Sequence, residues 1–433
     1  MLIFLIQWYQ HDLVTARDTL VFCLGNMWHP LVLGIGSIPY LGYLLVRYWK
    51  IQIDKHGTTG FLRRLSLYTV SPLMIGAGLF TLFFQDLRTE GYGYEWDFGI
   101  GNGHGKLEES NDDGRIRGVH YFGRWRGETQ HNFDILVRNN IEHLVLVPYA
   151  YQSHHREPEL EFRNRRRGRV EQIDSTYRSL SAQATELGLM VIIKPHIWMR
   201  SDNGFWRSDI AFDSDEAFAT WSKDYSDFIL HFAKLSEDIG APFFCVGTEL
   251  SQLSKNYPDY WRDLIKEVRK VYSGKLFYAA NWHDEYEHIT FWDELDLIGI
   301  QAYFPLCMHP NPSVEELKAA WKQHANQLRR YSKRTGKPIF FSEIGYKSTH
   351  DAAENPWEWV DGPAGLTKKL STETQANCYH AFFEVFWTEP WFKGALIWQW
   401  RANHDEAGGL SNIDFTPQNK PAQNIIAKYF GDQ

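Results

Sequence analysis

Eight short apolar runs alternate with longer amphipathic segments after residue 115, and this alternation constrains the fold more than any other feature of the sequence. The runs span residues 116–123, 142–152, 189–198, 242–250, 275–282, 295–305, 337–346 and 393–401. Helical periodicity lies between most of them, at 171–188, 216–239, 257–272, 314–335 and 372–388. Because strands that alternate with helices form parallel βαβ units, we predict an α/β fold, a (β/α)8 TIM barrel over residues 115–433.

The runs themselves favour a closed barrel. MVIIK and LIGIQ are apolar almost without interruption, as expected for parallel strands whose two faces are both covered. A doubly wound open sheet is the competing architecture, but no GxGxxG follows an early strand.

Composition excludes several classes of function. The chain carries 45 Lys and Arg against 53 Asp and Glu, a net charge of -8, so a nucleic-acid partner is not expected. Its four cysteines are far apart and form no CxxC pair, which excludes a zinc ribbon or a disulfide scaffold. Aromatic residues reach 16%, a surplus that suits carbohydrate binding as well as a large core.

The first 84 residues differ from the rest. Residues 31–46 and 65–84 contain no charged side chain, and about 20 apolar residues are needed to cross a bilayer as a helix. We therefore expect 1–84 to form a helical hairpin with one or two transmembrane helices; the alternative is a buried hairpin packed on the barrel. The Gly-rich and acidic segment 85–114 is expected to be a linker.

Charge also predicts how such a hairpin is oriented. The 47–64 loop carries five basic residues and one acid, whereas the flank after Phe84 is acidic. By the positive-inside rule the loop is cytoplasmic. We expect a membrane-anchored protein whose catalytic domain lies on the extracytoplasmic side, periplasmic or extracellular.

Polar and aromatic side chains gather at the ends of the predicted strands. In a TIM barrel these ends form the active site. The residues there are His120, Tyr149, Tyr151, Lys194, His196, Trp198, Thr248, Glu249, Asn281, Trp282, Gln301, Tyr303, Glu343, Trp398 and Trp400. Glu249 and Glu343, on the fourth and seventh runs, are the only carboxylates among them.

Two carboxylates over one barrel mouth match the needs of glycosidic cleavage. One protonates the leaving oxygen, while the other attacks the anomeric carbon or activates water. Either glutamate alone would also suit a salt-bridged strand end. Both together predict a glycoside hydrolase, which needs no metal or other cofactor and takes an oligo- or polysaccharide substrate.

Four motifs in this order resemble glycoside hydrolase family 113, a β-mannanase family of clan A. They are GTEL around Glu249, IGIQAYFPL around Tyr303, SEIGY around Glu343 and the WQW that begins at Trp398, and the resemblance covers roughly residues 115–430. It implies a retaining β-1,4-mannanase or mannooligosaccharide hydrolase. Glu249 would be the acid/base, Glu343 the nucleophile, Tyr303 the donor that keeps the nucleophile ionised, and Trp398 the floor beneath the sugar. Much of the clan has Asn where this chain has Thr248.

The remaining strand-end residues are candidates for substrate binding. Lys194 and His196 could hold sugar hydroxyls, or form an ion pair and a core histidine. Asn281 and Trp282 suit a leaving-group subsite, or packing. The other candidates are His120, Thr248, Trp398 and Trp400.

Two alternative functions remain open at this point. A transglycosylase acting on an envelope polymer would use the same glutamates and exclude water. A non-catalytic carbohydrate-binding or assembly protein of the cell envelope would keep the barrel without turnover, and the presence of both glutamates argues against it.

Overall fold

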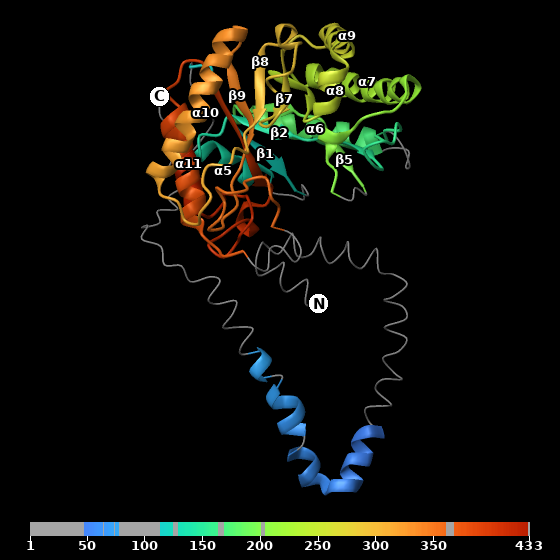
Figure 1. Ribbon diagram of the computed structural model, residues 1–433, viewed down its shortest axis with the longest axis vertical. Coiled ribbons are helices and arrows are strands. Elements are labelled where there is room, and N and C mark those ends of the chain that lie inside the picture. The colour runs from blue at the N-terminus through green and yellow to red at the C-terminus, as the bar shows by residue number, and fades with distance from the viewer. Residues whose placement is uncertain are drawn as a thin grey trace.

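The computed structural model describes residues 47–63, 65–72, 74–77, 113–123, 129–162, 169–200, 204–360 and 368–431 (Figure 1). Arg124 and Trp125, which follow the first strand, lie outside the described residues. Residues 163–168, an arginine-rich segment after the second run, also lie outside the described residues.

Eight parallel strands close into a barrel in the order β1-β10-β9-β8-β7-β6-β4-β2, which confirms the predicted α/β barrel. The closing pair joins Ile116 of β1 to Gly394 of β10. The barrel strands are β1 (Ile116–Phe122), β2 (His143–Leu146), β4 (Met190–Ile193), β6 (Phe243–Thr248), β7 (Lys275–Asn281), β8 (Leu297–Gln301), β9 (Ile339–Ile344) and β10 (Phe392–Arg401).

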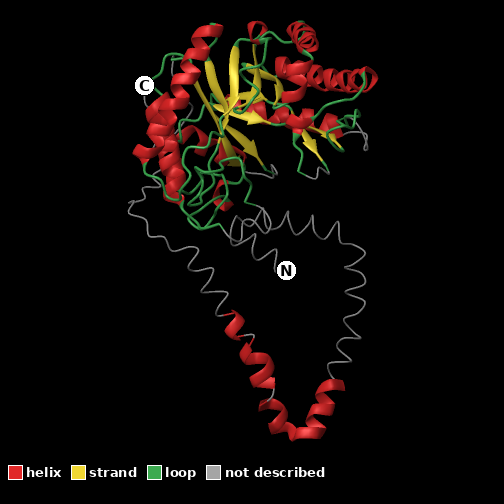
Figure 2. Ribbon diagram, viewed as in Figure 1, coloured by secondary structure: helices red, strands yellow, loops and turns green. Residues whose placement is uncertain are grey.

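Helices lie around the outside of these strands (Figure 2). The sequence defines both ends of α10. Ser313 and Glu316 form a reciprocal capping box at its start, and Gly336, at φ 67°, ends the helix in the left-handed region. The helices are α5 (Thr129–Arg138), α6 (Arg169–Glu186), α7 (Asp215–Asp238), α8 (Ser251–Asn256), α9 (Pro258–Arg269), α10 (Val314–Thr335), α11 (Thr372–Phe386) and α12 (Pro421–Gly431).

Alternation along the strands divides the core into two layers. Val145, Ile192 and Phe340 belong to a cluster that fills the barrel. Their neighbours Leu144 and Phe341 belong to the larger cluster between strands and helices. Because the interior is packed, a substrate site lies above it, at the carboxyl ends of the strands.

Two of the predicted runs are longer than the barrel strands they contain. Runs 142–152 and 189–198 continue into a separate pair of parallel strands, β3 (Tyr149–Gln152) and β5 (His196–Met199). Pro148 and Pro195 mark the breaks, because proline has no N–H for the ladder. The His196 N–H donates to the Pro148 carbonyl at 2.9 Å and resumes the pairing.

The structure does not support the N-terminal hairpin as predicted. Residues 47–63 are helical rather than a loop, and 65–72 and 74–77 are helical with a π turn at Ser66–Val70. Within these described residues, no helix has the length and apolar character needed to cross a bilayer. The first apolar segment, 31–46, and the linker up to residue 112 lie outside the described residues, so their assignment stays a prediction.

Candidate active site

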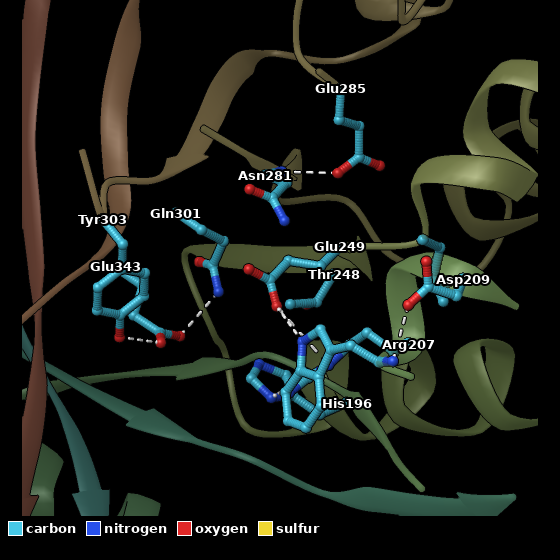
Figure 3. A network of polar contacts seen from close by, with 12 residues as sticks. His196, Arg207, Asp209, Thr248, Glu249, Asn281, Glu285, Gln301, Tyr303 and Glu343 are labelled. Atoms are coloured by element: carbon cyan, nitrogen blue, oxygen red, sulfur yellow. Dashed lines mark hydrogen bonds and ion pairs between the residues drawn. The ribbon is translucent and has the colours of Figure 1, made fainter. Parts of the chain in front are cut away.

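Glu343 lies near the end of β9, and Figure 3 shows its carboxylate beside Tyr303 and Gln301. Its Oε2 accepts hydrogen bonds from Lys194 Nζ at 2.8 Å and from Gln301 Nε2 at 2.9 Å. The Tyr303 hydroxyl donates to its Oε1. His120 Nε2 lies 3.7 Å from Oε2. The carboxylate is thus held in one orientation at the mouth of the barrel.

These contacts keep Glu343 ionised. Burial by itself would raise the pKa of this carboxyl, but the charge of Lys194 and the hydrogen bonds from Lys194 and Tyr303 outweigh it and bring the pKa to about 2. Burial and the negative charge of Glu343 raise the pKa of Tyr303 well above its ordinary value, so the phenol keeps its proton and donates. An ionised carboxylate is the form that a nucleophile needs.

His120 is a neutral member of the same network. Burial and the charge of Lys194 lower its pKa to about 3. Its Nε2 lies 3.1 Å from Lys194 Nζ and its Nδ1 lies 3.3 Å from the Ile397 carbonyl. Because an ammonium only donates and a carbonyl only accepts, Nδ1 carries the proton. His120 therefore orients Lys194 and does not compete for the charge of Glu343.

Glu249 follows β6 at a sharp turn. Its φ of 53° lies in the left-handed region, which residues with side chains seldom occupy. Two hydrogen bonds hold the turn: the Glu249 N–H donates to the Ala279 carbonyl at 2.9 Å, and the Leu250 N–H donates to the Tyr278 hydroxyl at 2.9 Å. The turn places the Glu249 side chain over the mouth and lets the chain continue into α8.

The surroundings change the pKa of Glu249 in the opposite direction to that of Glu343. Burial raises the pKa of this carboxyl; Arg207 lowers it and the charge of Glu343 raises it further. Trp206 Nε1 donates to Oε2 at 3.1 Å, and Arg207 Nε lies 3.7 Å from the same oxygen. Glu249 is therefore protonated more readily and Glu343 less, and a general acid and a nucleophile need this difference.

A buried glutamate, Glu285, supports both the turn at Glu249 and the end of β7. Glu285 accepts from Ser254 at 2.8 Å, from the Tyr278 hydroxyl at 2.6 Å and from the Asn281 N–H at 2.6 Å. Burial raises its pKa to about 7. Through Tyr278 it holds the turn at Glu249, and through Asn281 it holds the end of β7.

Thr248 and Asn281 flank the acid. The Thr248 hydroxyl donates to the Pro195 carbonyl at 3.3 Å, so its oxygen is left as an acceptor. The Asn281 Oδ1 accepts from the His283 N–H at 3.1 Å. Figure 3 shows the Asn281 side chain directed toward the space beside Glu249.

Aromatic rings form the floor of the barrel mouth. Trp398, Tyr303 and Phe415 form one cluster, against which Trp282 packs. Trp398 also lies 5.2 Å from the His120 ring, and Trp282 stacks on Trp357 at 5.6 Å. These positions agree with surfaces for sugar rings.

Trp400 does not belong to the site, contrary to the prediction. It is 1% exposed, lies in the core between strands and helices, and its ring is stacked on His404 at 5.8 Å. Its side chain is therefore not accessible to a substrate. The prediction failed because position along the strand end does not say which side of the sheet a side chain faces.

His196 is buried and paired with an arginine from the following loop. Its Nδ1 accepts from Arg207 Nη1 at 2.8 Å. Burial, Arg207 and Lys194 lower its pKa well below the ordinary value, so the ring is neutral.

The structure thus brings together His120, Lys194, His196, Thr248, Glu249, Asn281, Tyr303, Glu343 and Trp398, with Trp282 at the rim. Sequence reasoning missed Arg207 and Glu285. Both come from loops rather than strand ends, and no spacing in the sequence marks them. Gln301 was seen at a strand end but received no role.

A family model described as Glycoside Hydrolase Family 113 matches residues 119–420. Solved structures of the same kind are similar. A GH113 β-mannanase from Alicyclobacillus acidocaldarius, in complex with ManMIm, is 26% identical with a TM-score of 0.61, over 73% of this chain and 97% of that one. A GH113 β-1,4-mannanase complex is 26% identical with a TM-score of 0.63, over 74% and 99%. No curated protein matches the sequence.

Proposed function

This chain belongs to glycoside hydrolase family 113 and is a glycoside hydrolase, and from that premise we propose that it cleaves β-1,4-mannan or mannooligosaccharides with retention of configuration. One observation carries the mechanism: Glu343 accepts hydrogen bonds from Lys194, Gln301 and Tyr303, which keep its pKa low, whereas burial raises the pKa of Glu249. The identity of the sugar rests on similarity to β-1,4-mannanases at 26% and 25% identity.

In the first step Glu343 is the nucleophile. One of its oxygens bonds to the anomeric carbon as the bond from that carbon to the leaving oxygen breaks, and Glu249 gives its proton to that oxygen. Tyr303, Gln301 and Lys194 hold the nucleophile in place. Trp398 lies beneath the sugar and Asn281 beside it.

In the second step Glu249 is the base. Once Glu343 is esterified, its negative charge is gone, and that charge was one of the causes that raised the pKa of Glu249. Arg207 and the Trp206 N–H then stabilise the ionised Glu249. Glu249 takes a proton from water, the water oxygen bonds to the anomeric carbon, and Glu343 leaves as a carboxylate. Two displacements restore the starting configuration.

The test is hydrolysis of β-1,4-mannohexaose by the full-length enzyme, beside gluco- and xylo-oligosaccharides of equal length. Proton NMR at early times reports the configuration of the first product. We expect cleavage of the mannan series with a β-configured product, abolished by Glu343→Ala. Glu315→Ala, a carboxylate that is exposed on α10 and 79% accessible, is the matched control and stays active.

Other outcomes identify the alternatives. Chain elongation of an acceptor without net release of reducing ends indicates a transglycosylase. Binding without turnover by a folded wild type indicates the non-catalytic carbohydrate-binding role. An α-configured first product contradicts the retaining mechanism.

We also propose that residues 1–84 anchor the enzyme in a membrane, with the barrel on the extracytoplasmic side. The support is the two uncharged segments and the basic residues between them. The full-length chain should stay in the membrane pellet after an alkaline carbonate wash, and external protease should degrade the barrel of intact spheroplasts. Release by carbonate refutes the anchor, and protection from protease refutes the orientation.

A further inference from the structure

The strand pair β3–β5, which we call the ribbon, has one buried face and one aromatic face. Ala150, Gln152, Ile197 and Met199 are all buried, and they alternate along the two strands with aromatic residues. In register, Tyr149 pairs with His196 and Tyr151 with Trp198, so these four rings share the other face. The ribbon contacts β6 and the short helical turn Arg207–Asp209 through β5.

Ring contacts connect the aromatic face of the ribbon to Glu249. Trp206, which donates to Glu249 Oε2 at 3.1 Å, lies 6.2 Å from the Trp198 ring, edge to face. Tyr149 lies 6.0 Å from Trp198. Trp198 is nevertheless 40% exposed, although its neighbours on both strands are mostly buried. A large ring that two neighbouring rings hold in place and that is still 40% exposed is suited to stacking against a flat apolar ligand face.

The inner end of the same face is closed by a buried histidine. The Nδ1 of His196 accepts from Arg207, which can only donate, so in the neutral ring the proton lies on Nε2. His196 is 3% exposed, and its Nε2 has no hydrogen-bond partner. This nitrogen is itself buried, so the ring of Trp198 is the part of the aromatic face that a ligand can reach.

We infer that the ribbon binds the leaving-group sugars, with Trp198 stacking on a hexose ring. This inference rests on the proposed function. The acid gives its proton to the leaving oxygen, so the leaving sugar lies on the acid's side of the cleaved bond. Trp206 contacts both Glu249 and Trp198, and Arg207 contacts both Glu249 and His196, so the ribbon adjoins the acid. The occupant is therefore the departing part of a β-linked hexose chain.

The test compares two substrates of the full-length enzyme and of Trp198→Ala. Mannohexaose places sugars on both sides of the cleaved bond, whereas an aryl β-mannobioside with a small phenolate leaving group places none on the leaving side. We expect kcat/KM to fall about tenfold for mannohexaose and less than twofold for the aryl glycoside, since an aromatic stacking contact contributes roughly that factor. Trp198→Tyr, which keeps a flat ring, should recover most of the loss.

A second readout is the rate at which the glycosyl-enzyme, the covalent intermediate on Glu343, turns over. Added mannobiose should accelerate its turnover by transfer in the wild type, and Trp198→Ala should need about tenfold more mannobiose for the same effect. Met308→Ala, an apolar side chain that is 77% exposed on another loop, should change neither readout.

Three results separate the outcomes. An equal loss on both substrates, or no loss on either, overturns the assignment of the ribbon. Failure of the wild type on both mannosides while it cleaves another β-linked series refutes the mannan assignment instead, and the same comparison on that series then decides the role of Trp198. A wild type that is folded and inactive on every series overturns both.

Discussion

Replacing Lys194 with methionine should move the acidic limb of the pH profile. Lys194 Nζ donates to Glu343 at 2.8 Å and is completely buried, so the substitution removes the cation and leaves the burial of Glu343 unchanged. Breaking such a pair costs about 3–5 kcal/mol, and one pKa unit corresponds to about 1.4 kcal/mol. The pKa of Glu343, about 2 in the wild type, should therefore rise by roughly 2–4 units.

The assay is kcat/KM against pH on an activated aryl glycoside, because its acidic limb reports the nucleophile of the free enzyme. The wild type should stay active as far down in pH as it stays folded. Lys194→Met should lose activity about tenfold per pH unit below a limb near pH 4–6. A variant whose acidic limb coincides with that of the wild type would refute the reasoning.

A second buried lysine separates this effect from lost stability. Lys347 is also completely buried, and its Nζ donates to the Asn355 carbonyl at 2.9 Å, away from Glu343. Lys347→Met should lower the melting temperature without moving the acidic limb. If it moves the limb as far as Lys194→Met does, the shift reflects loosening of the barrel and not the ion pair.

Two further predictions concern the other carboxyls. Arg207→Met removes a cation that lowers the pKa of Glu249, so the alkaline limb of kcat/KM should move to higher pH; an unmoved limb would contradict the role of Arg207. Burial raises the folded-state pKa of Glu285 from 4.5 to about 7. The stability linked to this group is therefore complete below pH 4.5 and declines through pH 7, by about 3 kcal/mol. Chemical unfolding at pH 5 and pH 8 should show this decline in the wild type and not in Glu285→Gln; equal declines would contradict it.

The barrel could be predicted because its signal is local. Every barrel strand lies within one of the eight apolar runs to within a residue, and helices such as α7 and α10 fall where the helical periodicity places them. The ribbon could not be separated from β2 and β4 by periodicity, because its strands continue the same apolar runs. Pro148 and Pro195 were the available signal, since each removes one donor from the ladder.

The site could be predicted only where chemistry lies at strand ends. Strand-end position singled out Glu249, Glu343 and Tyr303; Tyr303 donates to Glu343 and Trp206 donates to Glu249, and the catalytic roles stay predictions. Arg207 acts from a loop beyond β5, and its pairing with His196 and Glu249 depends on a chain path that no local pattern encodes. Trp400 shows the opposite error, because a strand end has two faces and the sequence does not choose between them.

The ribbon lies outside the hydrogen-bonded ladder of the closed barrel. Insertions or exchanges in β3 and β5 therefore leave the pairing of the eight barrel strands untouched, and with it the support of Glu343. During evolution the sugar-binding surface can therefore change while the residues around Glu343 stay the same. For protein engineering, the same separation makes the two short strands Tyr149–Gln152 and His196–Met199, each of which follows a proline, the place to graft new polymer preferences.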